Sequence, residues 1–207
     1  KRRRQPIPWA DLPAWWQKVR TLPNPVRRDL NLLMLFTGLR ATDACTVRWE
    51  HLDFAKGTVY RPKPKGGEDK AFTVPLPRFI LRLLARRRLA NVVQFPEGDG
   101  GWAFPTVNRE GNVKATSEPK EQRWEYGVGG MIKKTFYLPT PHRLRDTFAT
   151  ACLEAGVGHT ETKILLNHSL PNADVTMGYQ RPSTAHLRAC TEKVAAFLLS
   201  NKRSPRL

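Results

Sequence analysis

Six polar residues recur along this 207-residue chain in an order and with local spacings that suit one kind of chemistry: Arg40, Lys65, His142, Arg145, His168 and Tyr179. A phenol has an intrinsic pKa of about 10 and is a poor nucleophile unless its surroundings activate it. Arginine, histidine and lysine supply such surroundings around a phosphodiester, because they bind its oxygens and move protons. The chemistry that this set suits is the cutting and rejoining of a DNA strand through a phosphotyrosine.

Two members of the set lie three residues apart, in His142-Arg143-Leu144-Arg145. On a helix this spacing places both side chains on one face, so they can address one substrate. The guanidinium binds two nonbridging oxygens with parallel hydrogen bonds, and the imidazole exchanges protons near neutral pH. Alone, the pair is equally typical of the surface of any basic helix.

Arg40 directly follows a glycine-containing break in an apolar helical segment, Leu35-Phe36-Thr37-Gly38-Leu39. An arginine at such a junction is unusual for a core and suits a site. The alternative is a structural salt bridge, with Asp43 as the nearest acidic candidate.

Five short segments together resemble the catalytic domain of the tyrosine recombinase (phage integrase) family: Thr37-Gly38-Leu39-Arg40, Pro64-Lys65-Gly66-Gly67, His142-x-x-Arg145, Leu166-Asn167-His168-Ser169 and Met177-Gly178-Tyr179. They follow the family's order from about residue 30 to residue 182. The resemblance implies a mainly α-helical fold with a small antiparallel β-hairpin sheet (α+β). It also implies a covalent 3′-phosphotyrosine intermediate, with no metal and no nucleotide cofactor.

The resemblance assigns a role to each residue. Arg40 and Arg145 clamp the scissile phosphate, and Tyr179 is the nucleophile. His142 is the general base or proton relay, whereas His168 donates a hydrogen bond to the phosphate. Preorganised cations stabilise the extra negative charge of the phosphorane transition state.

The hairpin lysine, which protonates the departing 5′ oxygen, is assigned to Lys65. Lys63 and Lys70 share the same loop and are alternatives. The position of Lys65 directly before Gly66-Gly67 favours it, because a flexible loop lets the amine reach into a duplex.

Departures from the family pattern concern neighbours of the catalytic groups. Asp43 stands where glutamate is common, and Arg143 stands where aspartate is common, with Asp146 nearby. Asn167 stands where glycine is frequent. We expect residues 1–8 to be a basic linker or arm and residues 9–207 the catalytic domain, without the family's N-terminal core-binding domain.

Periodicity and turn residues predict the elements in order. Helices are expected over 9–52 with a break at Gly38, over 79–93, near 120–134, and over 141–154, 160–166, 174–179 and 184–199. Strands are expected at 58–61 and 71–75, and 96–118 is expected to be a connecting loop anchored by Trp102 and Phe104. The amphipathic helix 184–199 packs either on its own core or on a neighbouring protomer.

The chain carries 35 Lys and Arg against 18 Asp and Glu, a formal charge of +17, which favours a polyanionic partner. Double-stranded DNA is the expected partner, bound by a homotetramer at specific sites; the isolated protein is expected to be a monomer. Accessory DNA-bending or directionality proteins are further candidate partners. No apolar run is long enough to span a membrane, so a cytoplasmic, nucleoid-associated protein is expected. The odd number of cysteines, Cys45, Cys152 and Cys190, indicates reduced core thiols.

The same residues are compatible with two other functions. A type IB topoisomerase or telomere resolvase uses the same chemistry without pairing two DNA sites. A noncatalytic basic DNA-binding module would keep the same residues as phosphate contacts. The complete set of six argues against the second.

Overall fold

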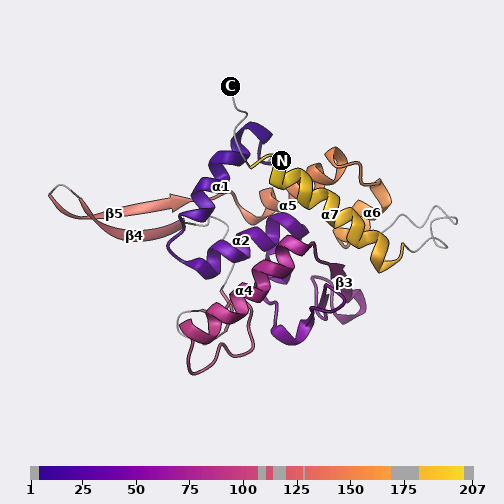
Figure 1. Cartoon of the computed structure of the whole chain (residues 1–207), viewed down its shortest axis with the longest axis horizontal. Coiled ribbons are helices and arrows are strands. Elements are labelled where there is room, and N and C mark those ends of the chain that lie inside the picture. Colours follow the sequence, from indigo (N-terminus) through magenta and orange to yellow (C-terminus); the bar gives the residue numbers. More distant parts are fainter. Residues whose placement is uncertain (1–4, 107–110, 114–119, 128, 169–181, 203–207) are drawn as a thin grey trace.

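A central helix, α2 (Pro25–Thr37), organises the fold of the computed structural model, which describes residues 5–106, 111–113, 120–127, 129–168 and 182–202. Five helices contact α2 and surround it (Figure 1): α1 (Leu12–Arg20), α3 (Ala41–Cys45), α4 (Arg78–Gln94), α5 (Pro141–Glu154) and α7 (Thr184–Ser200). A seventh helix, α6 (His159–Leu165), packs between α5 and α7. No helix in these residue ranges is long and apolar enough to cross a membrane.

Both ends of α2 follow from the sequence. Asn24 caps the start, because its side-chain oxygen accepts hydrogen bonds from the backbone N–H groups of Val26 and Arg27. Gly38 ends the helix in the left-handed conformation, with φ +62°. The predicted break at Gly38 is therefore confirmed.

A small antiparallel sheet lies beside the helices, in the order β1 (Leu52–Asp53), β2 (Thr58–Arg61), β3 (Phe72–Pro75). The register pairs Val59 with Val74, which places two buried valines opposite each other. The two predicted strands and their connecting loop are confirmed. Strand β1 adds an edge that was not predicted.

The helix predicted near 120–134 is wrong. This segment forms a second antiparallel pair, β4 (Lys120–Gly127) and β5 (Gly130–Tyr137), which projects away from the helices (Figure 1). Gly129 and Gly130, with φ +101° and φ +117°, form the turn that a helix cannot contain. The aromatic and β-branched residues of both strands fit this conformation better than a helix.

The remaining helix predictions agree with the structure within one or two residues, apart from the helix expected at 174–179, which lies outside the described residues. The loop expected over 96–118 is described at 96–106 and 111–113, where it contains no helix. The pattern over 9–52 resolves into α1, α2, α3 and short 3₁₀ turns. Phe104 anchors the connecting loop with no exposed surface, and Trp102 lies under the Arg48 guanidinium. Helix α7 buries its apolar face, including Val194 and Leu198, on the core of its own chain.

The three cysteines are buried thiols that belong to no disulfide, as predicted. Burial raises the pKa of the Cys152 thiol to about 12, so the reactive thiolate is scarce at neutral pH. These side chains are therefore packing groups.

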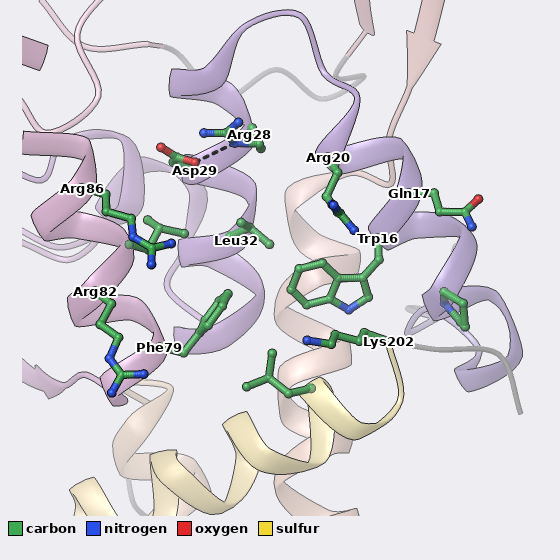
Figure 2. Close-up of a pocket in the computed structure, with 13 residues that line it drawn as sticks. Trp16, Gln17, Arg20, Arg28, Asp29, Leu32, Phe79, Arg82, Arg86 and Lys202 are labelled. Atoms are coloured by element: carbon green, nitrogen blue, oxygen red, sulfur yellow. Dashed lines mark hydrogen bonds and ion pairs between the residues drawn. The ribbon is translucent and has the colours of Figure 1, made fainter. Parts of the chain in front are cut away.

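A groove with a volume of about 1050 Å³ opens between α1, α2, α4 and the end of α7 (Figure 2). Its walls combine aromatic and aliphatic side chains with arginines and one lysine. The candidate catalytic residues are not among its lining residues.

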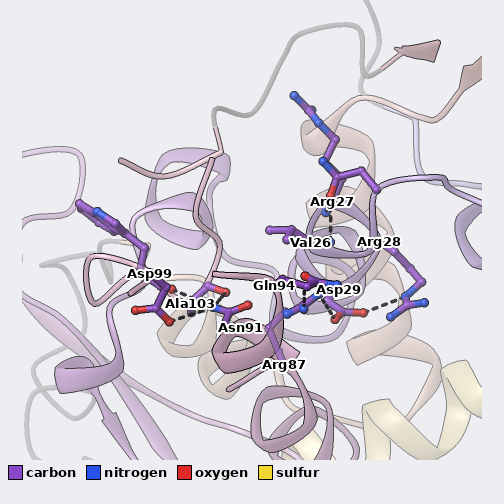
Figure 3. A network of polar contacts seen from close by, with 11 residues as sticks. Val26, Arg27, Arg28, Asp29, Arg87, Asn91, Gln94, Asp99 and Ala103 are labelled. Carbon is purple, nitrogen blue, oxygen red and sulfur yellow. Dashed lines mark hydrogen bonds and ion pairs between the residues drawn. The ribbon is translucent and has the colours of Figure 1, made fainter. Parts of the chain in front are cut away.

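A buried polar network joins α2 to α4 beside this groove (Figure 3). The Arg87 side chain is 1% exposed, and its Nη1 lies 3.4 Å from Oδ2 of Asp29. Its Nη2 donates to Oε1 of Gln94 at 2.7 Å, while Asp29 also accepts from Nε of Arg28 at 2.9 Å. A charge buried this deeply stays in the fold only because its partners compensate for the lost water.

Removing one partner of this pair is expected to destabilise the protein strongly. Asp29→Asn leaves the Arg87 charge buried without a counterion, and such changes cost about 3–5 kcal/mol. The double variant Asp29→Asn/Arg87→Met removes both charges and should be more stable than Asp29→Asn alone. Urea unfolding followed by circular dichroism measures both.

The exposed pair Lys63–Glu68 supplies the control, because both side chains are more than half exposed. Glu68→Gln should leave the urea midpoint unchanged. A double variant that is less stable than Asp29→Asn would show that Asp29 does not offset the cost of burying the Arg87 charge.

Candidate active site

Arg40 occupies the N-cap position of α3, directly after Gly38 and Leu39. Its backbone is extended, with φ −62° and ψ 149°, which turns the half-buried side chain away from the helix axis. Nη2 donates to the carbonyl oxygen of Asn167 at 3.4 Å. Within the described residues no ion pair joins Arg40 to Asp43, so the salt-bridge alternative is not supported.

Arg145 lies in the second turn of α5 and points toward the same region. Its Nη1 donates to the carbonyl of Gly38 at 2.6 Å, and its Nη2 donates to the carbonyl of Leu166 at 2.5 Å. The same Nη2 lies 2.9 Å from Nε2 of His168. The guanidinium therefore connects the end of α2 with the turn that follows α6.

That turn, residues 166–168, contacts both arginines. Asn167 adopts the left-handed conformation, with φ 47°, which asparagine tolerates better than most residues. The backbone N–H of His168 closes the turn on the carbonyl of Lys163 at 2.9 Å. Because arginine only donates, Nε2 of His168 accepts in this arrangement and the ring proton sits on Nδ1.

Lys65 lies on the exposed loop between β2 and β3. The loop reaches the site through its far end, where Nδ2 of Asn167 contacts the carbonyl of Lys70 at 3.5 Å. Lys63 is held by Glu68 at 2.5 Å, whereas Lys65 forms no ion pair within the described part of the loop. This difference favours Lys65 over Lys63 as the reaching lysine.

His142 is the second residue of α5 and is exposed. It precedes Arg145 by three residues, so both side chains leave the same face of the helix. The positive end of the α5 dipole lies at this turn and favours an anion there. The structure therefore brings Arg40, Arg145 and His168 to one turn and places His142 on the same helix as Arg145, while Tyr179 lies outside the described residues.

Two buried charges, Asp43 and Arg61, lie behind the arginines and were not predicted as part of the site. Each is 2% exposed. Burial raises the pKa of Asp43, although the positive charges of Arg61, Arg40 and Arg145 draw it down. Arg61 donates from Nη1 to the carbonyl of Thr46 at 3.1 Å. Its place next to the exposed Tyr60 in the alternation of β2 is the signal that would have found it.

Gly38 allows the two halves of the site to approach. A Cβ on this residue would overlap the ring of Phe148 and would lie 2.8 Å from Cδ2 of Leu166. The carbonyl oxygen of Gly38 itself accepts the hydrogen bond from Nη1 of Arg145. Close packing and positive φ therefore both require glycine here.

Gly38→Ala should lower the free energy of unfolding by about 2–5 kcal/mol, the sum of about 1–2 for the left-handed backbone and about 1–3 for overpacking. Gly156→Ala is the matched control, because Gly156 has φ +68° and an added Cβ there would meet no atom within 4 Å. It should show the backbone cost alone in urea unfolding. Equal losses in both variants would contradict the close approach at Gly38.

The sequence profile of the phage integrase family matches residues 17–186. The chain belongs to the phage integrase family. Within it, the chain is 31% identical over 189 residues to tyrosine recombinase XerA of Pyrococcus furiosus, covering 88% of this chain and 59% of the relative. It is 26% identical to prophage integrase IntF of Escherichia coli, covering 91% of this chain and 38% of the relative.

Solved structures of phage integrase relatives share the fold. The integrase from mycobacterium phage Brujita superposes with a TM-score of 0.60 at 23% identity, over 99% of this chain and 65% of that one. The Tn1549 transposon integrase, in complex with a circular intermediate DNA, gives 0.58 at 18% identity, over 93% of this chain and 67% of that one. The chain spans about three-fifths of the recombinases named XerA, at 57–59% of their length.

Proposed function

We propose that the chain is the catalytic part of a site-specific DNA recombinase that cuts and rejoins strands through a 3′-phosphotyrosine on Tyr179. The observation that supports this most is the 166–168 turn. It contacts Arg40 through Asn167 and contacts Arg145 through Leu166 and His168. Two guanidinium groups held by one turn form a pair of cations of fixed geometry, which is the arrangement that a phosphorane transition state needs.

The proposed reaction begins with in-line attack of the Tyr179 oxygen on the scissile phosphorus. The phenolic proton passes to His142 as the P–O bond to tyrosine forms. The P–O bond to the 5′ oxygen breaks, and the Lys65 ammonium gives that oxygen its proton. In the second half the 5′ hydroxyl of another strand attacks the phosphotyrosine and regenerates Tyr179, so bond energy is conserved without a cofactor.

Arg40 is the cation most available to the phosphate. Within the described residues its guanidinium forms one hydrogen bond, to Asn167, and its other N–H groups have no hydrogen-bond partner there. His168 faces Arg145 through Nε2. A phosphate oxygen between these two would accept from Arg145, and from His168 once that ring is protonated.

The proposed partner is double-stranded DNA carrying specific recombination sites. One relative was solved in complex with DNA, and this chain has an excess of 17 positive charges. Pairing two sites requires a homotetramer on DNA formed from monomers, and accessory DNA-bending or directionality proteins would then select integration or excision. Such a reaction takes place in the cytoplasm at the nucleoid.

Strand exchange distinguishes this proposal from the type IB topoisomerase and telomere-resolvase alternatives. Two plasmids carrying the DNA that flanks the gene are incubated with the protein, and recombinant junctions are counted by sequencing. A recombinase gives junctions at one position in these plasmids and none in plasmids lacking the flanking DNA. Relaxation of supercoiled plasmid regardless of sequence, without junctions, would instead support the topoisomerase.

A further inference from the structure

The groove between α1, α2, α4 and α7 has an apolar floor and a cationic rim. Trp16 and Leu32 form part of the floor and are 8% and 6% exposed, with Phe79 and Leu83 beside them. The Trp16 and Phe79 rings meet edge to face, with their centroids 6.2 Å apart, and Figure 2 shows arginines on both sides of them. A floor of this kind fits apolar side chains better than water.

The rim charges have no counterion among the residues that the structure describes. Arg20, Arg82, Arg86 and Lys202 are exposed, and none forms an ion pair with another described residue. The one carboxylate in the lining, Asp29, is already bound by Arg28 and Arg87. The groove therefore has a strong positive field, with no counterion for these four residues in the part of the chain that the structure describes.

The apolar surface continues beyond the groove along α4. Arg82, Arg86, Leu89 and Val93 follow one another at helical spacing, so they share a face. Leu89 and Val93 are 72% and 80% exposed. Contiguous exposed apolar side chains next to a groove are typical of a protein contact and not of a contact with phosphates.

We propose that this groove and the adjoining face of α4 bind an acidic amphipathic helix of another protein. Its apolar residues would cover Trp16, Phe79 and Leu83, and its carboxylates would lie against Arg20 on one rim and Arg82 on the other. Helices that insert one apolar face into such a groove are a common mode of recognition. Charge complementarity selects the acidic class of partner.

Other occupants fit less well. The chain's own termini are basic, with Lys1–Arg4 at one end and Arg203 and Arg206 at the other. A second copy carries 35 basic against 18 acidic residues and would bring like charge to the rim. The phosphates of duplex DNA would neutralise the basic side chains of the rim, but the apolar floor and the exposed apolar side chains of α4 would stay in contact with water.

The test uses a fluorescein-labelled helical peptide of about 15 residues with leucines at i, i+3, i+4 and i+7 and glutamates elsewhere. Fluorescence anisotropy measures its binding to the full chain. The groove variant is Arg20→Glu/Arg82→Glu. The matched control is Lys18→Glu/Arg88→Glu, which changes the same net charge on the same two helices, outside the groove lining.

We expect the groove variant to bind the peptide at least about tenfold more weakly, and the control to change binding by less than about threefold. A peptide of the same composition with shuffled leucines should also lose about tenfold. Leu89→Ser/Val93→Ser, which changes only exposed side chains, should weaken binding as well. Circular dichroism establishes that each variant is folded.

Equal weakening by the groove and control variants would overturn the proposal, because diffuse charge would then explain binding. Equal binding of the shuffled peptide would overturn it too. Failure of the acidic peptide to bind, with a single-stranded oligonucleotide bound through Arg20 and Arg82, would assign the groove to nucleic acid. A sedimentation coefficient that depends on these arginines would assign it to a second copy.

Discussion

Arg145→Ala is expected to slow DNA cleavage by about 10²–10³-fold, the usual effect of losing one preorganised donor to a transition-state oxyanion. The structure shows that Arg145 joins the carbonyls of Gly38 and Leu166. We propose that it also supplies positive charge at the phosphate. The rate is measured in a single turnover on a nicked duplex, with enough protein to saturate the DNA.

Three further variants separate these tasks. Arg145→Lys keeps the charge but loses the planar fork, so its rate should fall between those of alanine and arginine. Arg40→Ala removes a guanidinium that forms one hydrogen bond within the described residues and should lose rate on the same scale without a comparable loss of stability. Arg143→Ala, whose side chain bonds the carbonyls of Gln5 and Pro6, should cleave normally. Cleavage by Arg145→Ala within about fivefold of the unchanged protein would contradict the clamp.

Local patterns predicted the parts of the fold that depend on neighbouring residues. The end of α2 at Gly38 and the strands β2 and β3 follow from turn residues and alternation, so both could be located from the amino-acid sequence. The strands of segment 120–137 could not be located in this way, because its mixture of charged and aromatic residues fits both the 3.6-residue period of a helix and the 2-residue period of a strand. Its turn glycines favoured a hairpin, and the helical interpretation gave them too little weight.

The site shows the same division. The spacing of His142 and Arg145 predicted a shared face of one helix. The contact of Arg145 with Gly38 spans 107 residues, and the contact of Arg40 with Asn167 spans 127. Local periodicity cannot predict contacts between residues so far apart in the sequence. Asp43 reveals its place only through burial among distant charges, because a charged residue in a sequence is expected at the surface, whereas the alternation of β2 offers a local signal for Arg61.

Tyr179→Phe is expected to abolish covalent attachment to DNA, a larger effect than that of any change around the phosphate. The variant lacks the oxygen that forms the bond to phosphorus, while the aromatic ring remains. Binding to the nicked duplex should therefore be retained, since the cations that contact phosphates are unchanged. Retained binding distinguishes loss of the nucleophile from loss of the fold.

The chain has four tyrosines, which gives a complete set of controls. Tyr60→Phe, Tyr126→Phe and Tyr137→Phe each remove one other phenol. Tyr60 is the sharpest of these, because it is 46% exposed on β2, next to the Lys65 loop. All three variants should form the adduct.

The most direct measurement is mass spectrometry of the protein trapped on a suicide duplex, nicked near the cleavage point and carrying the DNA that flanks the gene. The proposed function predicts a 3′-phosphate joined to the peptide that contains Tyr179, and no adduct in Tyr179→Phe. An adduct that persists in Tyr179→Phe, or that maps to Tyr60, Tyr126 or Tyr137, would contradict it.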